Sequence, residues 1–497
     1  YSTQLHQKPF MTQSISKLQN IADIRRFFLT NERPLFFISP TNFNLFGIDD
    51  WVKKFSSITY RDCWDEQCPH HFTPSLSPNS PFENTKNLQA GQLEIVDYNN
   101  YLLQHPEVIE FIKQVGGQPI ALFLMFDEET EALCKRHNLE IWFPSAQLRK
   151  KLDDKIETVR LGNLAGVPSV PNCLSTVDSY PHLLDLAGIH NLGHDLVIQT
   201  SFGDSGHTTF FIANEADWKN YGDEITGCGV VKIMKRIDCH SVTQEACITK
   251  AGTIVAPLQT SVIGFPELTP DRGGWSGNEL FAGALTPAIC HQAQDYTLKF
   301  AEQLRKVGYR GYFDLDYLID HQTGQLYLSE INPRISGATP LTSHSAFASE
   351  HVPMFLFHLL EFSDVEFDLD VETFNTAWAA ASATKDCWGS LIIKHTRDSI
   401  EQVKKAPQPG IWSMDDAGNL RYSRFDHRCH SLSSKTEALV QRVAGVGNYR
   451  YRGGDCVRMI LRDRVMTDDF QLSDRAKRWI NGILAEYQTE VVHSNFL

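Results

Sequence analysis

The 497-residue sequence predicts a multidomain protein of mixed α/β and α+β class. A strand–helix–strand pattern near the start is typical of a parallel sheet covered by helices. From His194 the chain turns to strand patterns, which a long amphipathic helix and a predicted hairpin follow. At about 150 residues per domain, the length alone predicts two to four domains.

Composition and charge restrict the class of partner. Hydrophobic residues make up 42% of the chain and charged residues 21%, as in globular proteins that fold without a partner. Because 46 basic residues face 60 acidic ones, the net charge is −14, and neither nucleic acid nor a membrane is expected to bind. No apolar run approaches the roughly 20 residues that cross a bilayer. Eleven scattered cysteines, an odd number, favour free thiols and a cytoplasmic location.

Residues 1–150 are expected to form the first domain, and residues 1–10, which precede Met11, are interpreted as a remnant ahead of the natural start. Buried strands and one helix with an acidic beginning are predicted at 34–38, 119–126, 127–138 (the helix) and 139–143. The segment 69–87, rich in Pro, Ser and Asn, is typical of a long surface loop. Strand, helix and strand in this order predict a parallel layer.

A change of unit is expected at Gly166, because this glycine and Pro168 end a strongly helical stretch over 145–165. The strands and the amphipathic helix that follow are predicted at 195–200, 208–213, 229–235, 241–248 and 286–307 (the helix). Alternating strands at 311–319 and 325–331 flank a turn and predict a hairpin. The pattern restarts beyond about residue 366 and ends in a helix over 473–488.

The hairpin carries the most informative polar residues. Asp314 and Asp316 alternate onto one face of its first strand, and Glu330 and Asn332 do the same on its second. Two carboxylates and an amide oxygen at short range favour a hard cation between them, and such ligands suit Mg²⁺ shared with phosphates. Arg334, two residues further on, would then neutralise phosphate charge. The alternative is an exposed hairpin whose acids are solvated.

A second candidate lies between two predicted strands, in the sequence Thr-Ser-Phe-Gly-Asp-Ser-Gly-His-Thr-Thr at 200–209. Glycines and small hydroxyl residues at such a turn free backbone N–H groups to face an anion. The segment has neither the Gly-Lys-Ser/Thr of a Walker A loop nor the glycine spacing of a Rossmann turn. An ordinary hairpin loop is the alternative.

Two further groups have weaker patterns. Cys63, Cys68, His70 and His71 lie close together in the sequence, but their spacing matches no usual structural zinc site, and they are interpreted as loop residues. The sequence Gly-Gly-Trp-Ser-Gly at 273–277 is either a plain loop or a mobile segment that packs on a ligand, since its tryptophan is flanked by three glycines.

Taken in order, these pieces resemble the ATP-grasp superfamily. The resemblance rests on a helix with Asp154 and Lys155, a strand–loop–strand unit, Lys-Ile-Met-Lys-Arg-Ile at 232–237, and Asp316 followed by Glu-Ile-Asn-Pro-Arg at 330–334. Segments 231–240, 272–278 and 447–455 are similar to the subgroup with a pre-ATP-grasp domain, the pheganomycin-type peptide ligases. The resemblance covers most of the chain.

The resemblance implies three domains. Residues 1–150 would be a pre-ATP-grasp α/β domain, followed by an ATP-grasp domain over 151–365. Within it, residues from about 155 to 240 would cover the nucleotide and residues 241–365 would bind metal. Residues 366–497 would form a C-terminal α+β domain.

The resemblance also implies roles for single residues. ATP would be bound by Lys155, by Gln199, Ser201, Gly203, Ser205 and Gly206 around the loop, and by Met234, Lys235 and Ile237 of the hinge strand. Mg²⁺, or Mn²⁺ in its place, would be held by Asp316, Glu330 and Asn332, while Arg334, Asn332 and Glu330 would be the catalytic residues. Gly274, Trp275, Ser276 and Asn278 would contact the substrate.

Position 199 departs from the family pattern. Many members have a lysine on the strand before the glycine-rich loop, where this chain has Gln199. Either another cation such as Lys232 or Lys235 contacts the phosphates, or ATP binding is weakened. Arg334 is followed by Ile-Ser-Gly-Ala-Thr, without the Gln-Val-Glu-His of biotin carboxylases, and no Met-Lys-Met biotinyl sequence occurs. Biotin and bicarbonate chemistry is therefore disfavoured.

The resulting hypothesis is an ATP-dependent carboxylate–amine ligase that works through an acyl phosphate and releases ADP and phosphate. Its substrates would be a small-molecule or peptide carboxylate and an amine, and the protein would act as a homodimer. Two alternatives stay open. One is a phosphotransferase that uses the same site, and the other, motivated by Gln199, is a nucleotide-binding regulatory protein without turnover.

Overall fold

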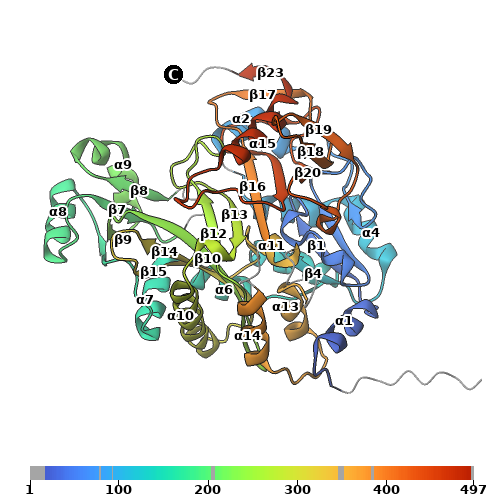
Figure 1. The fold of residues 1–497 in the computed structure, drawn as a ribbon, viewed down its shortest axis with the longest axis horizontal. Helices are drawn as coiled ribbons and strands as arrows, with labels where there is room; N and C mark the ends of the chain where they lie inside the picture. Colours follow the sequence, from blue (N-terminus) through green and yellow to red (C-terminus); the bar gives the residue numbers. More distant parts are fainter. Residues whose placement is uncertain are drawn as a thin grey trace, which may run out of the picture.

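The computed structural model describes residues 17–77, 80–91, 93–202, 208–344, 352–381 and 386–493. In these residues the strands form sheets of five, eleven, four and three strands (Figure 1). The predicted class, a multidomain mixture of α/β and α+β structure, is confirmed. No helix in the described ranges has both the length and the apolar composition needed to span a membrane.

The N-terminal sheet is parallel throughout, in the order β3-β2-β1-β4-β5. Its strands are β1 (Leu35–Ser39), β2 (Phe55–Thr59), β3 (His71–Phe72), β4 (Ile120–Phe123) and β5 (Glu140–Ile141). Its helical segments are α1 (Ile21–Leu29), η1 (Phe43–Leu45), η2 (Ile48–Asp50), η3 (Pro81–Glu83), α2 (Thr85–Ala90), α3 (Ile95–Gln104), α4 (Pro106–Val115) and α5 (Glu128–Arg136). Every residue of β1 and β4 is buried, as expected for strands covered on both faces.

Two predictions in the first 165 residues are wrong in part. Segment 69–87 is not one long loop, because it contains β3, η3 and the start of α2. The helix predicted over 145–165 is divided into α6 (Ala146–Leu152) and α7 (Lys155–Ala165). Asp154 has an extended backbone and accepts a hydrogen bond from the Ile156 amide at 2.8 Å, so it caps a new helix. The break makes Lys155 the first residue of α7.

A four-stranded antiparallel sheet follows, in the order β6-β9-β7-β8, and we call it the 172–235 unit. Its elements are β6 (Asn172–Thr176), α8 (Tyr180–Ile189), β7 (Leu196–Gln199), β8 (Thr209–Ile212), α9 (Glu215–Gly227) and β9 (Val230–Lys235). The unit projects from the side of the molecule that lies opposite the N-terminal sheet (Figure 1). Residues 236–238 connect β9 to the central sheet.

The central sheet has the order β15-β14-β10-β12-β13-β16-β22-β20-β18-β19, with β11 paired to β10. Its strands are β10 (Cys239–Thr249), β11 (Gly252–Val255), β12 (Gln259–Ile263), β13 (Trp275–Phe281), β14 (Gly311–Asp320), β15 (Leu326–Asn332), β16 (Cys387–Lys394), β18 (Gly410–Met414), β19 (Leu420–Arg424), β20 (Glu437–Arg442) and β22 (Asp455–Leu461). Because β13 pairs with β16, the sheet is continuous across the domain boundary expected at residue 366.

The remaining elements are η4 (Ala282–Ala284), α10 (Pro287–Lys306), α11 (Thr339–His344), α13 (Phe355–Phe362), α14 (Val371–Ala381), β17 (Ile400–Lys405), η5 (Cys429–Ser431), β21 (Tyr449–Arg450), α15 (Asp474–Ala485) and β23 (Gln488–His493). The predicted hairpin is β14–β15, and the predicted helices over 286–307 and 473–488 are α10 and α15. Three short strands, in the order β21-β17-β23, form the small C-terminal sheet.

The two faces of the central sheet have different surroundings. Val242, Phe313 and Leu315 lie in one core with residues of α10. The opposite face packs toward the N-terminal domain, where Ile392 and Ile460 share a core with β1. Side chains on this second face also reach the turn after β1, since Arg458 Nη1 donates to Thr41 Oγ1 at 2.7 Å and Gln441 Nε2 to Asn42 Oδ1 at 2.6 Å.

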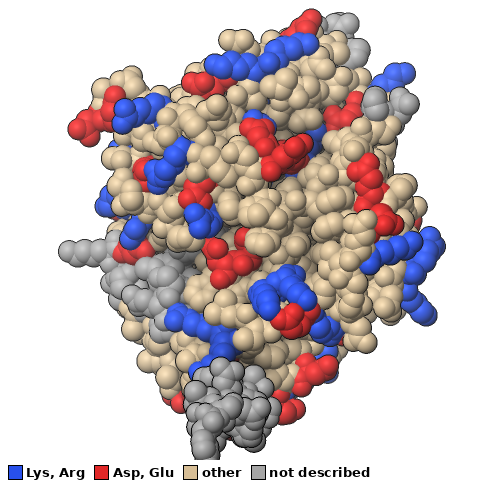
Figure 2. Space-filling view, turned by 90° about the vertical axis from the view of Figure 1, so that its right-hand side faces the viewer, with Lys and Arg blue, Asp and Glu red and all other residues tan. Residues whose placement is uncertain are grey.

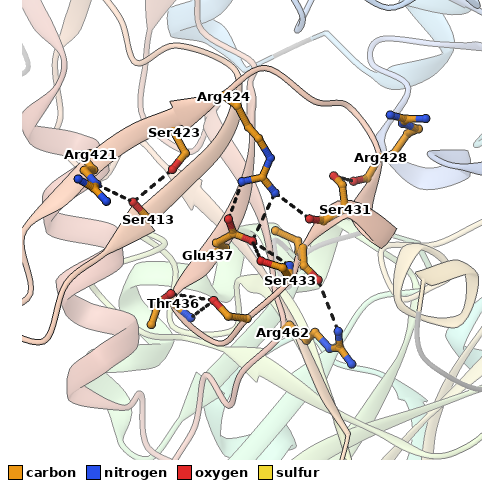
Figure 3. A network of polar contacts seen from close by, with 12 residues as sticks. Ser413, Arg421, Ser423, Arg424, Arg428, Ser431, Ser433, Thr436, Glu437 and Arg462 are labelled. Atoms are coloured by element: carbon orange, nitrogen blue, oxygen red, sulfur yellow. Dashed lines mark hydrogen bonds and ion pairs between the residues drawn. The ribbon is translucent and has the colours of Figure 1, made fainter.

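A polar network fixes the loop between β19 and β20 at the edge of the central sheet (Figure 3). Glu437 accepts hydrogen bonds from Arg424 and from both the backbone N–H and the hydroxyl of Ser433, the latter two at 2.8 Å. Arg424 Nη2 also donates to the Ser431 carbonyl at 2.8 Å. The bond from Arg424 lowers the pKa of Glu437 to about 2. The network therefore stabilises the loop with charges that neutralise each other.

Candidate active site

The predicted acids of the hairpin lie together on one face of the central sheet. Asp314 is directly opposite Asn332 across the β14–β15 pair, and Asp316 is directly opposite Glu330. Opposed residues of antiparallel strands share a face, so all four side chains point to the same side. This is the face that packs toward the N-terminal domain, and we call the four residues the acidic face.

Hydrogen bonds tie the members of the acidic face to one another. Asn332 Nδ2 donates to Asp314 Oδ1 at 2.7 Å and to Asp316 Oδ2 at 3.0 Å. Thr243 of β10 donates its hydroxyl to Asp316 Oδ1. The second oxygen of Asp314 is buried and has no hydrogen-bond partner among the described residues. The arrangement thus contains more acceptors than donors.

Burial makes ionisation of these acids costly. It raises the pKa of Asp314 to about 7. The pKa of Asp316 is raised well above its usual range, first by burial and then by the neighbouring charges of Asp314 and Glu330. Buried carboxylates that repel one another are stabilised by a proton or by a cation. The described residues contain no group of three or more His, Cys, Asp or Glu side chains arranged to hold a metal, so Cys63, Cys68, His70 and His71 form no such site either.

The structure adds one acid that the sequence analysis missed. Glu245 of β10 lies directly opposite Asp314 and is fully buried. It accepts hydrogen bonds from Tyr312 (2.6 Å), Gln259 (2.7 Å) and Thr342 (3.0 Å). Burial raises its pKa to about 7. Thr243 and Glu245 stand two apart in the strand predicted over 241–248, so they share one face, and that alternation is the signal that could have marked them.

Glu245→Gln is expected to stabilise the protein more at pH 8 than at pH 5. Because the pKa of Glu245 in the folded protein exceeds the ordinary glutamate value of 4.5, the folded protein holds a proton between pH 4.5 and 7 that the unfolded chain has lost. The wild type therefore loses stability over this window, by about 2 kcal/mol between pH 5 and 8, and the glutamine variant is spared that loss.

Urea unfolding of both proteins at pH 5 and pH 8 measures the effect. Glu302→Gln, on the half-exposed surface of α10, is the matched control and should show the same change in unfolding free energy as the wild type. If the unfolding free energies of the wild type and Glu245→Gln differed by the same amount at pH 5 and pH 8, the raised pKa of Glu245 would be contradicted.

Two lysines approach the acidic face from the neighbouring elements. Lys155 Nζ lies 3.2 Å from Glu330 Oε2, and its side chain is 6% exposed. Its backbone N–H donates to the Ser201 carbonyl at 2.9 Å, which ties the start of α7 to the end of β7. Lys232 of β9 is fully buried, and its ammonium donates to the Ser329 carbonyl at 3.3 Å. Burial lowers the pKa of Lys232 to about 8, against the opposing charge of Glu330.

The other described residues that are predicted to bind the nucleotide lie on β7 or β9 or directly after these strands. Gln199 is buried on β7. Met234 is buried on β9, whereas Lys235 is exposed at its end and Ile237 is half-buried in the connection to β10. Gly203, Ser205 and Gly206 lie outside the described residues.

Arg334 lies beside the acidic face but faces another acid. Its Nη1 is paired with Asp153, at the end of α6, and its side chain is 12% exposed. Arg149 of α6 donates from Nε to the Pro333 carbonyl at 3.2 Å, with its guanidinium stacked over Phe126. The end of α6, just before the helix break, therefore holds the chain just after β15.

The prediction of a mobile loop at 273–277 is wrong from Trp275 onward, because this residue begins β13. Its ring packs against Gly337, where an added Cβ would come within 2.0 Å of the indole. Trp275 Nε1 donates to Asn278 Oδ1 at 3.0 Å. Gly274 precedes the strand and donates to the Asp271 carbonyl, which closes a tight turn.

Asn278, unlike Ser276, is connected to the acidic face by polar contacts. Both are fully buried, and the Ser276 hydroxyl has no hydrogen-bond partner among the described residues. Asn278 Nδ2 lies 3.5 Å from Ser261 Oγ, which lies 2.9 Å from Thr243 Oγ1. Since Thr243 donates to Asp316, a chain of polar contacts runs across β13, β12, β10 and β14.

Two cavities, of about 330 and 310 Å³, lie elsewhere. Both are lined by Asp62 and Thr73, at the carboxyl edge of the N-terminal parallel sheet, and the first also by Arg61 and Arg442. Neither includes a residue of the acidic face, so the chemistry of the carboxylates and the lysines, not cavity volume, marks the candidate site.

No protein-family model matches the chain, and no curated protein sequence matches it either. Solved structures do match. The biotin carboxylase domain of 2-oxoglutarate carboxylase from Hydrogenobacter thermophilus, solved with MgADP, ADP and bicarbonate, is 13% identical with a TM-score of 0.59, covering 93% of this chain and 92% of that chain. Biotin carboxylase from Campylobacter jejuni is 14% identical with a TM-score of 0.54, covering 93% and 92%.

A second group of similar structures consists of carboxyaminoimidazole ribonucleotide synthases. N5-carboxyaminoimidazole synthase from Aspergillus clavatus, solved with ADP and its ribonucleotide, is 12% identical with a TM-score of 0.52, covering 87% of this chain and 94% of that chain. The similarity extends over nearly the whole of each protein. The chain therefore has the fold that these carboxylases and synthases share.

Proposed function

We propose that the protein is an ATP-dependent carboxylate–amine ligase. The observation that carries the proposal is the meeting of the acidic face with two buried lysines, since Lys155 pairs with Glu330 and Lys232 contacts the residue before it. Carboxylates beside lysines suit a nucleotide, because the acids can hold the cation and the lysines can hold the phosphates. The ATP-grasp fold, which in similar proteins binds ADP, supports the same reading.

The residues present fit a magnesium ion. Asp316, Glu330 and Asn332 would hold it, and the buried oxygen of Asp314 beside them, which has no hydrogen-bond partner among the described residues, supports a cation at this place. Asn332 now presents its nitrogen to both acids, and a half-turn of the amide would present its oxygen instead. Bound there, Mg²⁺ would offset the negative charge of the phosphates.

The chain's own residues would position the reactants. Lys155 would bind a phosphate of ATP, and the covering role predicted for the 201–209 loop falls mostly on residues outside the described ranges. Arg334 would separate from Asp153 and would then hold the transferred phosphoryl group. A carboxylate oxygen of the first substrate attacks the γ-phosphorus, the bond to ADP breaks, and an acyl phosphate forms. The amine of the second substrate then attacks the acyl carbon, phosphate leaves, and the amine loses a proton to give the amide.

The substrates belong to the finer part of the proposal. Ser276 and Asn278, of which Asn278 is linked to Asp316 through β12 and β10, would contact the carboxylate or the amine. Peptide-bond formation, a homodimer and a cytoplasmic location remain predictions. On the face drawn in Figure 2, basic and acidic side chains are interspersed and form no continuous basic surface among the described residues, which supports a small substrate rather than nucleic acid.

ADP release tests the proposal. Purified protein with Mg²⁺ and ATP is mixed with pools of amino acids and dipeptides, ADP is measured with a coupled assay, and the products are analysed by mass spectrometry. The proposal predicts ADP together with a product whose mass equals the two substrates minus water. A product that gains one phosphoryl group would instead make the protein a phosphotransferase. MgATP binding without ADP formation would make it a regulatory protein, and either result contradicts the ligase.

A further inference from the structure

Lys232 and Gln199 form a cross-strand pair in the 172–235 unit. The two residues lie directly opposite each other in the antiparallel pairing of β7 with β9. Directly opposed residues share a face of the sheet, with Cβ atoms about 5 Å apart. The ammonium of Lys232 and the amide of Gln199 thus leave the sheet side by side. If lysine and glutamine exchanged places across this pair, the positive charge would move by one strand but would stay on the same face of the sheet.

The surroundings of Lys232 lack the acid that a buried lysine normally needs. Its side chain is fully buried, yet its hydrogen bond goes to a neutral group, the Ser329 carbonyl. No carboxylate of the described residues lies within 4.0 Å of its ammonium, because Glu330 is paired with Lys155 instead. Burying an ammonium without an acid in contact costs several kcal/mol in general. A bound anion would relieve that cost.

Gln199, on the opposite strand, has a buried acceptor that lacks a donor. Its Nε2 donates to Thr209 Oγ1 of β8 at 3.3 Å, but its Oε1 is buried and has no hydrogen-bond partner among the described residues. A neutral amide with an unpartnered oxygen cannot bind phosphate as strongly as an ammonium does. Gln199 would therefore lie beside the bound phosphates without supplying a positive charge to them.

We propose that Lys232 supplies, from β9, the phosphate-binding ammonium that Gln199 cannot supply from β7. The inference rests on the proposed nucleotide site and assigns a residue within it. Lys235, the other cation considered for this role, does not fit. It is exposed, it stands an odd number of residues from Lys232 and so points to the other face of β9, and it lies opposite Leu196.

Calorimetric binding of MgATP tests the assignment. Lys232→Met keeps the length of the side chain and removes its charge, and a buried methionine is well tolerated. We expect it to weaken MgATP binding at least about tenfold, the loss of one charge-assisted hydrogen bond, while adenosine affinity stays unchanged. Lys219→Gln, on the exposed surface of α9 in the same unit, is the matched control and should bind MgATP like the wild type.

The transposed variant, Gln199→Lys with Lys232→Met, makes the test specific. It returns the ammonium to the same face one strand away, and we expect MgATP affinity within about threefold of the wild type. Unchanged MgATP affinity in Lys232→Met, or no recovery in the transposed variant with a wild-type melting temperature, would overturn the inference. A wild-type protein that binds no MgATP would instead contradict the proposed function itself, so the two failures are distinguishable.

Discussion

Replacing Glu330 with glutamine is expected to lower Mg²⁺-dependent ADP release at least about a hundredfold. The loss follows because Glu330 would hold the metal and also neutralises Lys155, and removing one such electrostatic contact typically costs a factor of 100 to 1,000. The fold should persist, since the side chain is 28% exposed and glutamine can still accept from the lysine. Turnover at saturating ATP, measured beside the melting temperature, gives the answer.

Glu302→Gln is again the matched control, because it removes a half-exposed acid from the neighbouring helix α10. It should retain wild-type turnover. Full activity in Glu330→Gln would contradict the assignment of the acidic face as the metal site, whatever the substrate.

Asp316→Asn is expected to abolish turnover and at the same time to raise the melting temperature at pH 8 in the absence of Mg²⁺. The two effects have one cause. Burial and the adjacent charges of Asp314 and Glu330 raise the pKa of Asp316 far above its usual range, so the ionised form destabilises the folded protein as the pH rises. Asparagine removes that charge, and the Thr243 hydroxyl can accept from its amide as readily as it now donates.

Adding Mg²⁺ distinguishes an acid that binds the metal from an acid whose ionised form is only destabilised by burial and by neighbouring charges. Ligands that bind only the folded state raise its stability, so Mg²⁺ with ADP should raise the melting temperature of the wild type and leave that of Asp316→Asn nearly unchanged. Asp314→Asn is the matched variant on the same strand and should lose less activity. An equal loss in both variants would contradict the preference for Asp316, and full turnover in Asp316→Asn would contradict the site.

The hairpin could be predicted because the residue pattern that specifies it lies within the hairpin itself. Alternation places Asp314 and Asp316 on one face without any knowledge of the rest of the fold, and the turn between the strands fixes their pairing. The acidic start of α5 and the end of α7 at Gly166 follow from equally local rules of helix capping.

The elements that the sequence analysis missed depend on distant contacts. Glu245 joins the acidic face only through the register of β10 on β14, which are separated by about 70 residues and could pair in other ways. β13 contains Gly277 and directly follows Gly273 and Gly274, a composition typical of a loop, yet it is held as a strand by β12 and β16 on either side. The break between α6 and α7 was missed because Asp154 was read as part of a continuous helix rather than as a cap.

Gln199 illustrates the same limit at the candidate site. From the sequence alone, a glutamine where a lysine is expected leaves two readings, a weakened site or a substitute cation. The pairing of β7 with β9 separates Lys232, which shares a face with Gln199, from Lys235, which does not. Only the three-dimensional register distinguishes the two lysines.

A crystal structure with Mg²⁺ and a non-hydrolysable ATP analogue tests the central claim most directly. We expect the metal at about 2.0–2.1 Å from oxygens of Asp316, Glu330 and Asn332, with the phosphates against Lys155 and Lys232. A nucleotide bound instead in the cavity between Arg61 and Arg442, or a metal that contacts none of the three residues, would contradict it.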